Sequence, residues 1–313
     1  MTNYKILITD GLDETGQSIL RNSGIVDDKS GISADDLFKV IPEYDALIVR
    51  GRTKVTASIM DAGSRLKVIG RAGVGVDNID LEAAKKHGIA VVNAPTSTSL
   101  AVAELTFGLM LALAREIPRA DDGMKQGKWL KKELEGVELN GKTLGVIGFG
   151  RIGVEVGRRA AAFGMNVIAY DPLISEDEIN KRGAEPTSLQ DLYAWSDFIS
   201  LHMPLTVDTR DMIGSQAFFQ MKDGVRIVCA ARGGIIDESA LVEALNSGKV
   251  AGAALDVFAK EPPCLEEAVS HPRVIATPHI GAQTAEAQSR ASEDIAVEVL
   301  SALQGESLRW RVA

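Results

Sequence analysis

Short apolar runs alternate with amphipathic segments along the whole chain. In the first third, the apolar runs predict β-strands at residues 5–9, 46–50, 66–71 and 89–93. The segments between them repeat apolar side chains every three or four positions, which predicts helices at residues 14–22, 34–40 and 81–86. Strands that alternate with helices in this way favour a parallel sheet covered by helices on both faces.

The second half repeats the rhythm more strongly, and we expect two α/β domains, each with a doubly wound parallel sheet. The first is expected at residues 1–97 and 284–313, because the last helical pattern, at 283–303, should return to it, and the second at 98–283. A helix from Leu100 to about Ile117 is apolar on several faces, which predicts either burial in a core or a subunit interface. The strands of the second half are predicted at residues 143–148, 167–171, 198–202, 226–230, 251–257 and 274–277.

Composition narrows the class of protein. The 313 residues are 45% hydrophobic and 25% charged, as in a soluble globular chain. The net charge of -9, without a run of Lys or Arg, argues against a nucleic-acid partner. We expect no signal peptide and no membrane span, because the N-terminus enters a strand and the longest apolar stretch, residues 105–114, is short and interrupted. Cys229 and Cys264 form no CxxC pair and have no histidine at ligand spacing, so we expect a cytoplasmic protein without a bound metal.

A glycine-rich segment carries the first candidate chemistry. Gly148, Gly150 and Gly153 form a GxGxxG pattern that follows a predicted strand, opens a helical pattern and precedes a strand closed by Asp171. This context is typical of dinucleotide binding, in which the glycines admit a tight turn, the pyrophosphate and close helix packing. Asp171 is expected to bind the adenosine ribose and to favour NAD over NADP, unless it only begins a turn with Pro172.

Three further residues, Arg232, Glu261 and His279, each follow an apolar strand of the second half. The carboxyl ends of parallel strands face the ligand crevice, so these side chains should converge there. Reduction of a keto acid needs a proton and a positive charge beside the developing alkoxide, and an imidazolium and a guanidinium supply them. A carboxylate beside the imidazole would stabilise its charged form. Each residue alone could instead be a surface ion-pair partner, a turn residue or a strand-end cap.

The segment at residues 70–80 (GRAGVGVDNID), together with the Arg232, Glu261 and His279 segments, resembles the D-isomer-specific 2-hydroxyacid dehydrogenases over essentially the whole chain. The likeness is strongest to members of the phosphoglycerate type. It implies a flavodoxin-like substrate domain and a Rossmann NAD domain with a cleft between them, usually in a homodimer. It also implies that Arg232 grips the substrate carboxylate and keto oxygen, that His279 exchanges the proton and that Glu261 pairs with His279.

The resemblance also implies two sets of binding residues. The substrate set is Arg50, Arg52, Gly73, Val74, Gly75, Arg232 and His279. Many phosphoglycerate-type members carry serine at the position of Gly51, which puts a phosphate contact there in question. The NAD set is Gly148, Gly150, Arg151, Ile152, Gly153, Asp171, His202, Met203, Pro204, Ala230, Ala231, Arg232, Asp256, His279, Gly281 and Ala282.

We therefore expect an NAD-dependent oxidoreductase that interconverts a D-2-hydroxy acid and its 2-keto acid. The favoured pair is 3-phosphoglycerate and 3-phosphohydroxypyruvate, at the entry to serine synthesis. Another anionic 2-hydroxy acid, such as sulfolactate, glycerate or lactate, is an alternative, and an NAD-sensing binding protein is a more distant one. The end at Ala313 leaves no room for an appended regulatory domain, so serine feedback through one is not expected.

Overall fold

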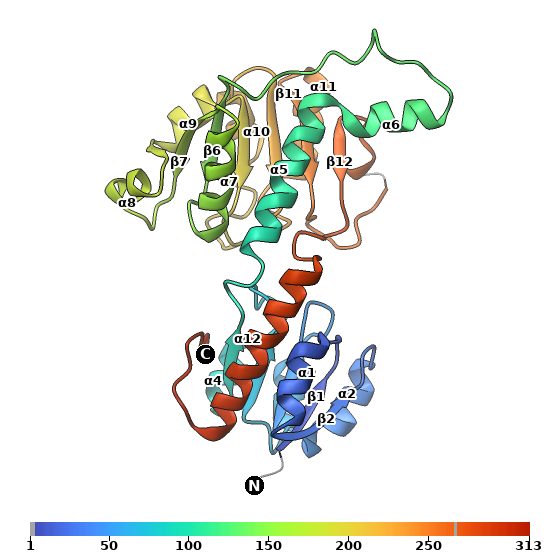
Figure 1. The fold of residues 1–313 in the computed structure, drawn as a ribbon, viewed down its shortest axis with the longest axis vertical. Helices are drawn as coiled ribbons and strands as arrows, with labels where there is room; N and C mark the ends of the chain where they lie inside the picture. The colour runs from blue at the N-terminus through green and yellow to red at the C-terminus, as the bar shows by residue number, and fades with distance from the viewer. Residues whose placement is uncertain (1–3, 266–267) are drawn as a thin grey trace. The chain divides into compact units, whose positions relative to one another are not determined.

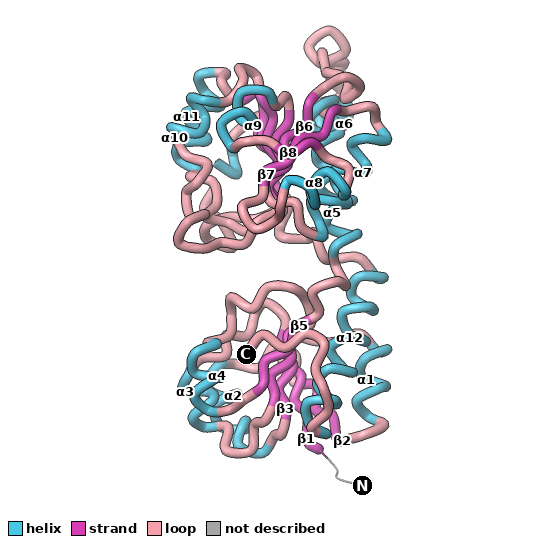
Figure 2. Tube along the Cα trace, turned by 90° about the vertical axis from the view of Figure 1, so that its left-hand side faces the viewer, coloured by secondary structure: helices cyan, strands magenta, loops and turns pink. Residues whose placement is uncertain are grey.

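The computed structural model describes residues 4–265 and 268–313. The chain divides into two compact units, of which unit 1 is Met1–Ser99 with Ala282–Ala313 and unit 2 is Leu100–Gly281. Each unit contains its own parallel sheet with helices on both faces (Figures 1 and 2). The fold class predicted from the alternation of strands and helices is confirmed.

In the described part of unit 1, five strands lie in the order β2-β1-β3-β4-β5, the flavodoxin-like arrangement. Strand β2 was not predicted, because this edge strand is half-exposed and ends in two aspartates, so it shows no apolar run. The elements of unit 1 are β1 (Tyr4–Ile8), α1 (Glu14–Arg21), β2 (Gly24–Asp28), α2 (Ala34–Val40), η1 (Ile41–Glu43), β3 (Ala46–Val49), α3 (Ala57–Ala62), β4 (Val68–Arg71), α4 (Leu81–His87), β5 (Ala90–Asn93) and α12 (Ala285–Gln304).

Helix α12 packs against α1 and the sheet of unit 1, which is otherwise built from the first third of the chain (Figure 1). Its buried Ile295 and Val299 share an apolar cluster with Ile6 and Ile8, whereas Leu7, between those two, belongs to the cluster on the opposite face of the sheet. This alternation is what a strand with both faces covered requires. The α1–α12 contact is close enough that a Cβ at residue 16, which is glycine, would overlap the backbone and hydroxyl of α12.

In the described part of unit 2, seven parallel strands lie in the order β12-β11-β10-β9-β6-β7-β8. The chain leaves β6 towards β7 and β8 and then crosses to β9 on the other side, so the strand order reverses between β6 and β9. The elements are α5 (Ser99–Arg115), α6 (Ile117–Lys125), β6 (Thr143–Ile147), α7 (Arg151–Ala162), β7 (Asn166–Tyr170), α8 (Glu176–Lys181), β8 (Glu185–Pro186), α9 (Leu189–Trp195), β9 (Phe198–Leu201), α10 (Ser215–Gln220), β10 (Val225–Cys229), α11 (Glu238–Ser247), β11 (Val250–Leu255), η2 (Ala268–Ser270) and β12 (Val274–Ala276).

The long helix expected from Leu100 to about Ile117 ends earlier, at Arg115. Glu116 has φ 50, in the left-handed region, and this breaks the helical pattern into α5 and α6. Most of α5 is buried, as its apolar faces predicted, but a narrow stripe containing Leu100, Glu104 and Gly108 is exposed.

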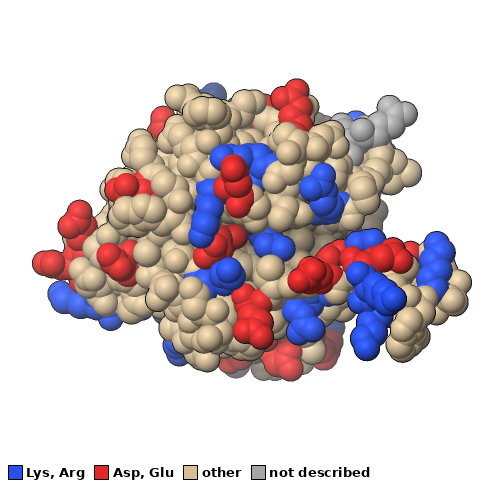
Figure 3. Space-filling view, turned by 90° about the horizontal axis from the view of Figure 1, so that it is seen from above, with Lys and Arg blue, Asp and Glu red and all other residues tan. Residues whose placement is uncertain are grey.

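Of the described helices, none combines the length and the hydrophobicity that crossing a bilayer demands. On the face shown in Figure 3, positive and negative side chains are interspersed over the surface.

Candidate active site

The glycine-rich turn of unit 2 links β6 to α7 at the point where the strand order reverses. Gly148 has φ 88, and a Cβ there would lie 2.8 Å from the carbonyl of His202. Gly153 packs against the Gly148 carbonyl so closely that a Cβ would overlap it, whereas a Cβ on Gly150 would meet open space. The turn therefore needs glycine at two positions for its shape and leaves room for a ligand at the third.

The first turn of α7 presents unused backbone donors. The first intrahelical hydrogen bond of α7 runs from Val154 N to Gly150 O, and no side chain caps the start of the helix. The N–H groups of Arg151, Ile152 and Gly153 thus lie at the positive end of the helix dipole without intrahelical acceptors. This donor set suits a pyrophosphate.

Asp171 follows β7 and supports the turn. Its Oδ2 accepts a hydrogen bond from Phe149 N at 2.8 Å, and its Oδ1 accepts one from Leu173 N at 2.9 Å. The second bond forms the local turn with Pro172 that was the alternative role expected for Asp171. Both roles are compatible with ribose binding, because a carboxylate has about four acceptor positions and two are used here.

His202, Met203 and Pro204 follow β9, and Ala230 and Ala231 follow β10, the two strands next to β6 on this side of the sheet. The His202 ring nitrogen Nε2 lies 2.7 Å from the Ser200 hydroxyl. Burial lowers the pKa of His202 to about 3, so this imidazole is neutral at physiological pH. His202 can line a cofactor site but cannot serve as the acid in this environment.

His279 and Glu261 form a direct pair. His279 Nδ1 lies 2.8 Å from Glu261 Oε2, and both side chains are partly exposed. Burial by itself would raise the pKa of Glu261, but the hydrogen bond and charge of His279, with a bond from Phe258 N and the charge of Arg232, lower it below its usual range. Glu261 is therefore an anion that fixes His279 through Nδ1, which leaves Nε2 for a reacting group.

Arg232 follows β10, and its influence on the Glu261 carboxylate places it in the same electrostatic neighbourhood. Its NH1 group donates to the Ala231 carbonyl at 2.7 Å. Gly233 packs so tightly on the Phe258 carbonyl that a Cβ there would overlap it. This contact joins the Arg232 loop to the segment that carries Glu261, and the structure thereby brings the three predicted catalytic residues together.

Asp256 holds the His279 loop. Its carboxylate, almost fully buried, accepts hydrogen bonds from Thr277 Oγ1 at 2.6 Å, Ile280 N at 2.8 Å and Gly281 N at 2.8 Å. These bonds flank His279, which has φ 54, in the left-handed region that a non-glycine residue seldom adopts. Asp256 was predicted to contact the cofactor, but this anchoring role was not predicted, because it depends on a loop more than twenty residues further along the chain.

In unit 1, the predicted substrate residues lie after β3 and β4. Among the described residues, the N–H groups of Val74 and Gly75 donate to no protein acceptor, whereas Gly73 N donates to Arg71 O at 2.8 Å. Two adjacent amides with free donors suit a carboxylate. Arg50 and Arg52 differ: the Arg50 guanidinium contacts the neutral Gln283 at 3.2 Å, but Arg52 donates to the carbonyls of Thr9 and Ile32.

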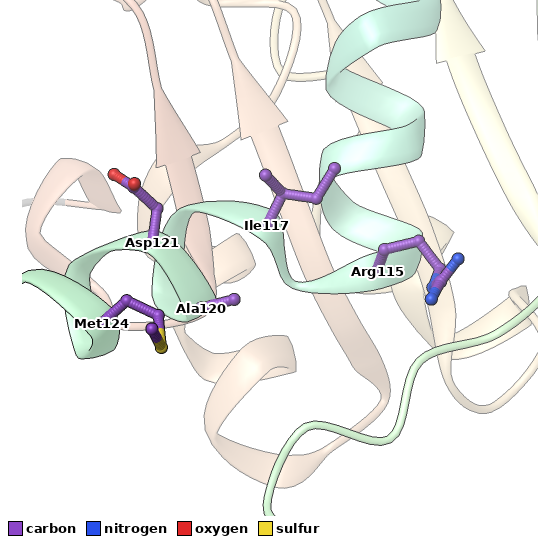
Figure 4. Close-up of a pocket in the computed structure, with 5 residues that line it drawn as sticks. All are labelled: Arg115, Ile117, Ala120, Asp121 and Met124. Carbon is purple, nitrogen blue, oxygen red and sulfur yellow. The ribbon is translucent and has the colours of Figure 1, made fainter. Parts of the chain in front are cut away.

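A hollow of about 420 Å³ lies elsewhere on unit 2, at the junction of α5 and α6 (Figure 4). It contains none of the predicted site residues. Ile117 and Met124, which line it, are both more than half exposed. We assign no chemistry to this hollow, whose lining residues are Arg115, Ile117, Ala120, Asp121 and Met124.

Several known proteins are similar to this chain in sequence and in fold. The chain is 49% identical over 305 residues to D-3-phosphoglycerate dehydrogenase of Rattus norvegicus, an alignment that covers 97% of this chain and 57% of the relative. The chain thus spans little more than half the length of that relative. It is 50% identical to hydroxypyruvate reductase of Thermotoga maritima, over 97% of this chain and 99% of that protein.

Among solved structures, D-lactate dehydrogenase from Aquifex aeolicus, complexed with NAD and lactic acid, is 33% identical with a TM-score of 0.83 over 96% of both chains. A glyoxylate reductase from Paecilomyes thermophila is 32% identical with a TM-score of 0.91, over 100% of this chain and 99% of the other. Residues 107–281 match the family model for the NAD binding domain of D-isomer specific 2-hydroxyacid dehydrogenases. The chain belongs to the D-isomer specific 2-hydroxyacid dehydrogenase family, and its cofactor is NAD.

Proposed function

We propose that this protein interconverts a D-2-hydroxy acid and its 2-keto acid with NAD, and that its substrate pair is 3-phosphoglycerate and 3-phosphohydroxypyruvate. The observation that carries the proposal is the His279–Glu261 pair, in which Nδ1 and Oε2 lie 2.8 Å apart and the charge of Arg232 helps to lower the pKa of Glu261. A proton donor, its anionic partner and a guanidinium together provide what reduction of a keto group requires. The phosphorylated substrate is supported by the cationic Arg50 loop and by the likeness to D-3-phosphoglycerate dehydrogenases.

In the proposed mechanism, NAD supplies or accepts the hydride. Protonated His279 donates a proton from Nε2 to the oxygen of the keto group during reduction, and neutral His279 removes it during oxidation. Glu261, bound to Nδ1, orients the ring and stabilises its charged form. Arg232 places a positive charge beside the carboxylate and keto oxygen and so stabilises the developing alkoxide.

The remaining substrate contacts are proposed from unit 1. The free N–H groups of Val74 and Gly75 would bind the carboxylate that all 2-hydroxy acids share. Arg50 would bind the group at the far end of the substrate, where a phosphate would gain a charge-assisted contact. We assign the NAD-binding role to unit 2 and the main substrate-binding role to unit 1 on these grounds.

A second candidate is hydroxypyruvate as the natural substrate. It is favoured by one observation: the chain is 50% identical to the hydroxypyruvate reductase of Thermotoga maritima, as similar as it is to the D-3-phosphoglycerate dehydrogenase of Rattus norvegicus at 49%. Hydroxypyruvate lacks the phosphate, so it would not use the charge of Arg50.

The deciding experiment is NADH oxidation with a panel of keto acids: 3-phosphohydroxypyruvate, sulfopyruvate, hydroxypyruvate, glyoxylate, pyruvate and 2-oxoglutarate. We expect the highest kcat/KM with 3-phosphohydroxypyruvate. A higher value with hydroxypyruvate would support the second candidate. Absence of turnover with every substrate, while NADH still binds, would support an NAD-sensing binding protein.

We further propose that the protein is a cytoplasmic homodimer. The two free cysteines, Cys229 and Cys264, fit a reducing compartment, and family membership favours self-association. Light scattering coupled to size-exclusion chromatography should give twice the 33.4 kDa mass of one chain.

A further inference from the structure

Unit 1 carries a buried carboxylate at the point where its strand order reverses. Its sheet order is β2-β1-β3-β4-β5, so the reversal lies between β1 and β3. Asp10 comes shortly after β1, and Arg50 comes directly after β3. In open α/β sheets this point, at the carboxyl ends of the strands, is where ligands bind.

The Asp10 carboxylate holds the loop at residues 50–53 by several hydrogen bonds. Its Oδ2 accepts from Arg50 N at 2.8 Å and from Thr53 N at 3.0 Å, and its Oδ1 accepts from Thr53 Oγ1 at 2.5 Å. The side chain is only 3% exposed. Burial alone would raise the pKa of Asp10, but these bonds and the charge of Arg52 lower it, so the group is an anion at neutral pH.

Asn78 holds the same loop from its carbonyl side. Its Nδ2 donates to Arg50 O at 3.1 Å and to Thr53 O at 2.7 Å. Asp10 therefore fixes the N–H groups of Arg50 and Thr53, while Asn78 fixes their C=O groups. Both ends of a four-residue loop are determined by side chains from outside it.

Because Asp10 and Asn78 hold the loop in this way, the guanidinium groups of its two arginines have different partners. The Arg52 guanidinium donates to Thr9 O at 2.8 Å and Ile32 O at 3.2 Å and lies 3.3 Å from Asp10. Arg52 is thus neutralised by Asp10 and committed to the backbone. Among the described residues, the one acceptor that the Arg50 guanidinium contacts is the uncharged Gln283, at 3.2 Å. The Arg50 guanidinium is attracted by Asp10 but forms no ion pair among the described residues, so its charge is available to a ligand.

We propose that Asp10, together with Asn78, is a positioning residue that aims Arg50 at a second anionic group on the substrate, beyond the carboxylate, and so sets selectivity for substrates with that second anion over substrates with an uncharged tail. Arg52 braces the loop and takes no part in this selection. The inference rests on the proposed function, because it assumes that the protein reduces 2-keto acids. It does not depend on which anion, phosphate or sulfonate, the substrate carries.

The test compares Asp10→Asn with the unmodified protein on three substrates: 3-phosphohydroxypyruvate, sulfopyruvate and hydroxypyruvate. Asparagine keeps the size of the side chain, but its N–H₂ group would face N–H or O–H donors of the loop and could not accept their hydrogen bonds. KM for the two anionic-tailed substrates should rise about tenfold or more, with kcat changed less than about threefold, because a charge-assisted contact is misdirected. KM for hydroxypyruvate should change less than about twofold.

Two further variants guard the test against a folding defect. The selectivity ratio is KM for hydroxypyruvate divided by KM for 3-phosphohydroxypyruvate. Thr53→Val removes one hydrogen-bond donor to Asp10 and keeps the shape of the side chain, so it should lower this ratio by a smaller factor than Asp10→Asn does. Arg52→Gln is the matched control, and it should lower the melting temperature without changing the ratio. NADH affinity, which belongs to unit 2, should be unchanged in all three.

The outcomes separate the two claims. An equal KM increase for hydroxypyruvate and for the two substrates with an anionic tail, or no increase in both Asp10→Asn and Thr53→Val, would overturn the inference. A drop of the ratio in Arg52→Gln would overturn the division of roles between the arginines. Failure of the unmodified protein to reduce any of the three substrates would instead refute the proposed function.

Discussion

The two units carry the proposed ligand sites at the same topological position but offer positive charge by different means. In unit 2, the reversal between β6 and β9 carries a glycine turn whose backbone N–H groups open α7. In unit 1, the reversal between β1 and β3 carries an arginine loop held by Asp10 and Asn78. One site uses fixed backbone dipoles, and the other uses a side-chain charge.

The difference has physical consequences. Backbone donors at a helix start need little side-chain ordering, so they suit a cofactor whose pyrophosphate never varies. A guanidinium loses side-chain entropy on binding, but its direction can be tuned by the residues that hold its loop. A carboxylate supports the loop in both units, since Asp171 binds Phe149 N just as Asp10 binds Arg50 N.

The largest effect is expected from His279→Gln. Loss of the proton donor should reduce turnover about 10²–10⁴-fold in both directions, while NADH still binds. NADH binding is measured by fluorescence and turnover by absorbance. If the variant kept more than about a tenth of the turnover, His279 would not be the proton donor.

Gly153→Ala should disable the backbone site of unit 2. The added Cβ would overlap the Gly148 carbonyl, so we expect a loss of about 1–3 kcal/mol in stability or in NADH binding. Gly108→Ala is the matched control, because its Cβ would meet open space on an exposed helix position, and it should stabilise by about 0.5–1 kcal/mol. Thermal unfolding and NADH titration distinguish the two, and equal behaviour would contradict the proposed role of the turn.

Asp171→Asn should narrow the preference for NAD over NADP. The unmodified protein should prefer NAD by about 1–3 kcal/mol, because a 2′-phosphate would meet the carboxylate. Asparagine removes the charge and can accept only one of the two backbone N–H bonds that Asp171 accepts. The ratio of kcat/KM values for the two cofactors should fall towards one. Equal use of both cofactors by the unmodified protein would refute this assignment.

Glu261→Gln should move the pH profiles rather than abolish activity. The pKa of Glu261 is lowered, so its carboxylate is charged above the pH range in which an ordinary carboxyl group titrates. The charge is lost only when the pH falls below that range. Without that charge, His279 Nδ1 loses its anionic hydrogen-bond partner, so the pH ranges of reduction and of oxidation should both move down. Glu238→Gln, a neighbouring carboxylate bonded to Ala259 N, is the control and should leave both profiles in place.

Much of the fold and of the candidate site could be predicted from local patterns. Parallel strands buried on both faces are continuous apolar runs, and the residues that follow them fall at one edge of the sheet. This rule selected Arg232, Glu261 and His279 as one group, and the structure brings them together. It failed for β2, whose half-exposed residues and two aspartates look like a loop, and for the end of α5, which Glu116 breaks by a left-handed conformation.

The sequence by itself determined the α/β class, the glycine turn and the identity of the chemically competent side chains, because each depends on residues close together in the chain. Only the tertiary structure decided what those side chains do. Asp10 and Arg50 lie 40 positions apart, and Asp256 and Ile280 lie 24 apart. Such pairs meet only because parallel strands bring their carboxyl ends to one edge. These contacts cannot be seen in the local sequence. They bind the Arg52 guanidinium to the backbone, leave the Arg50 guanidinium available to a ligand and hold His279 in place.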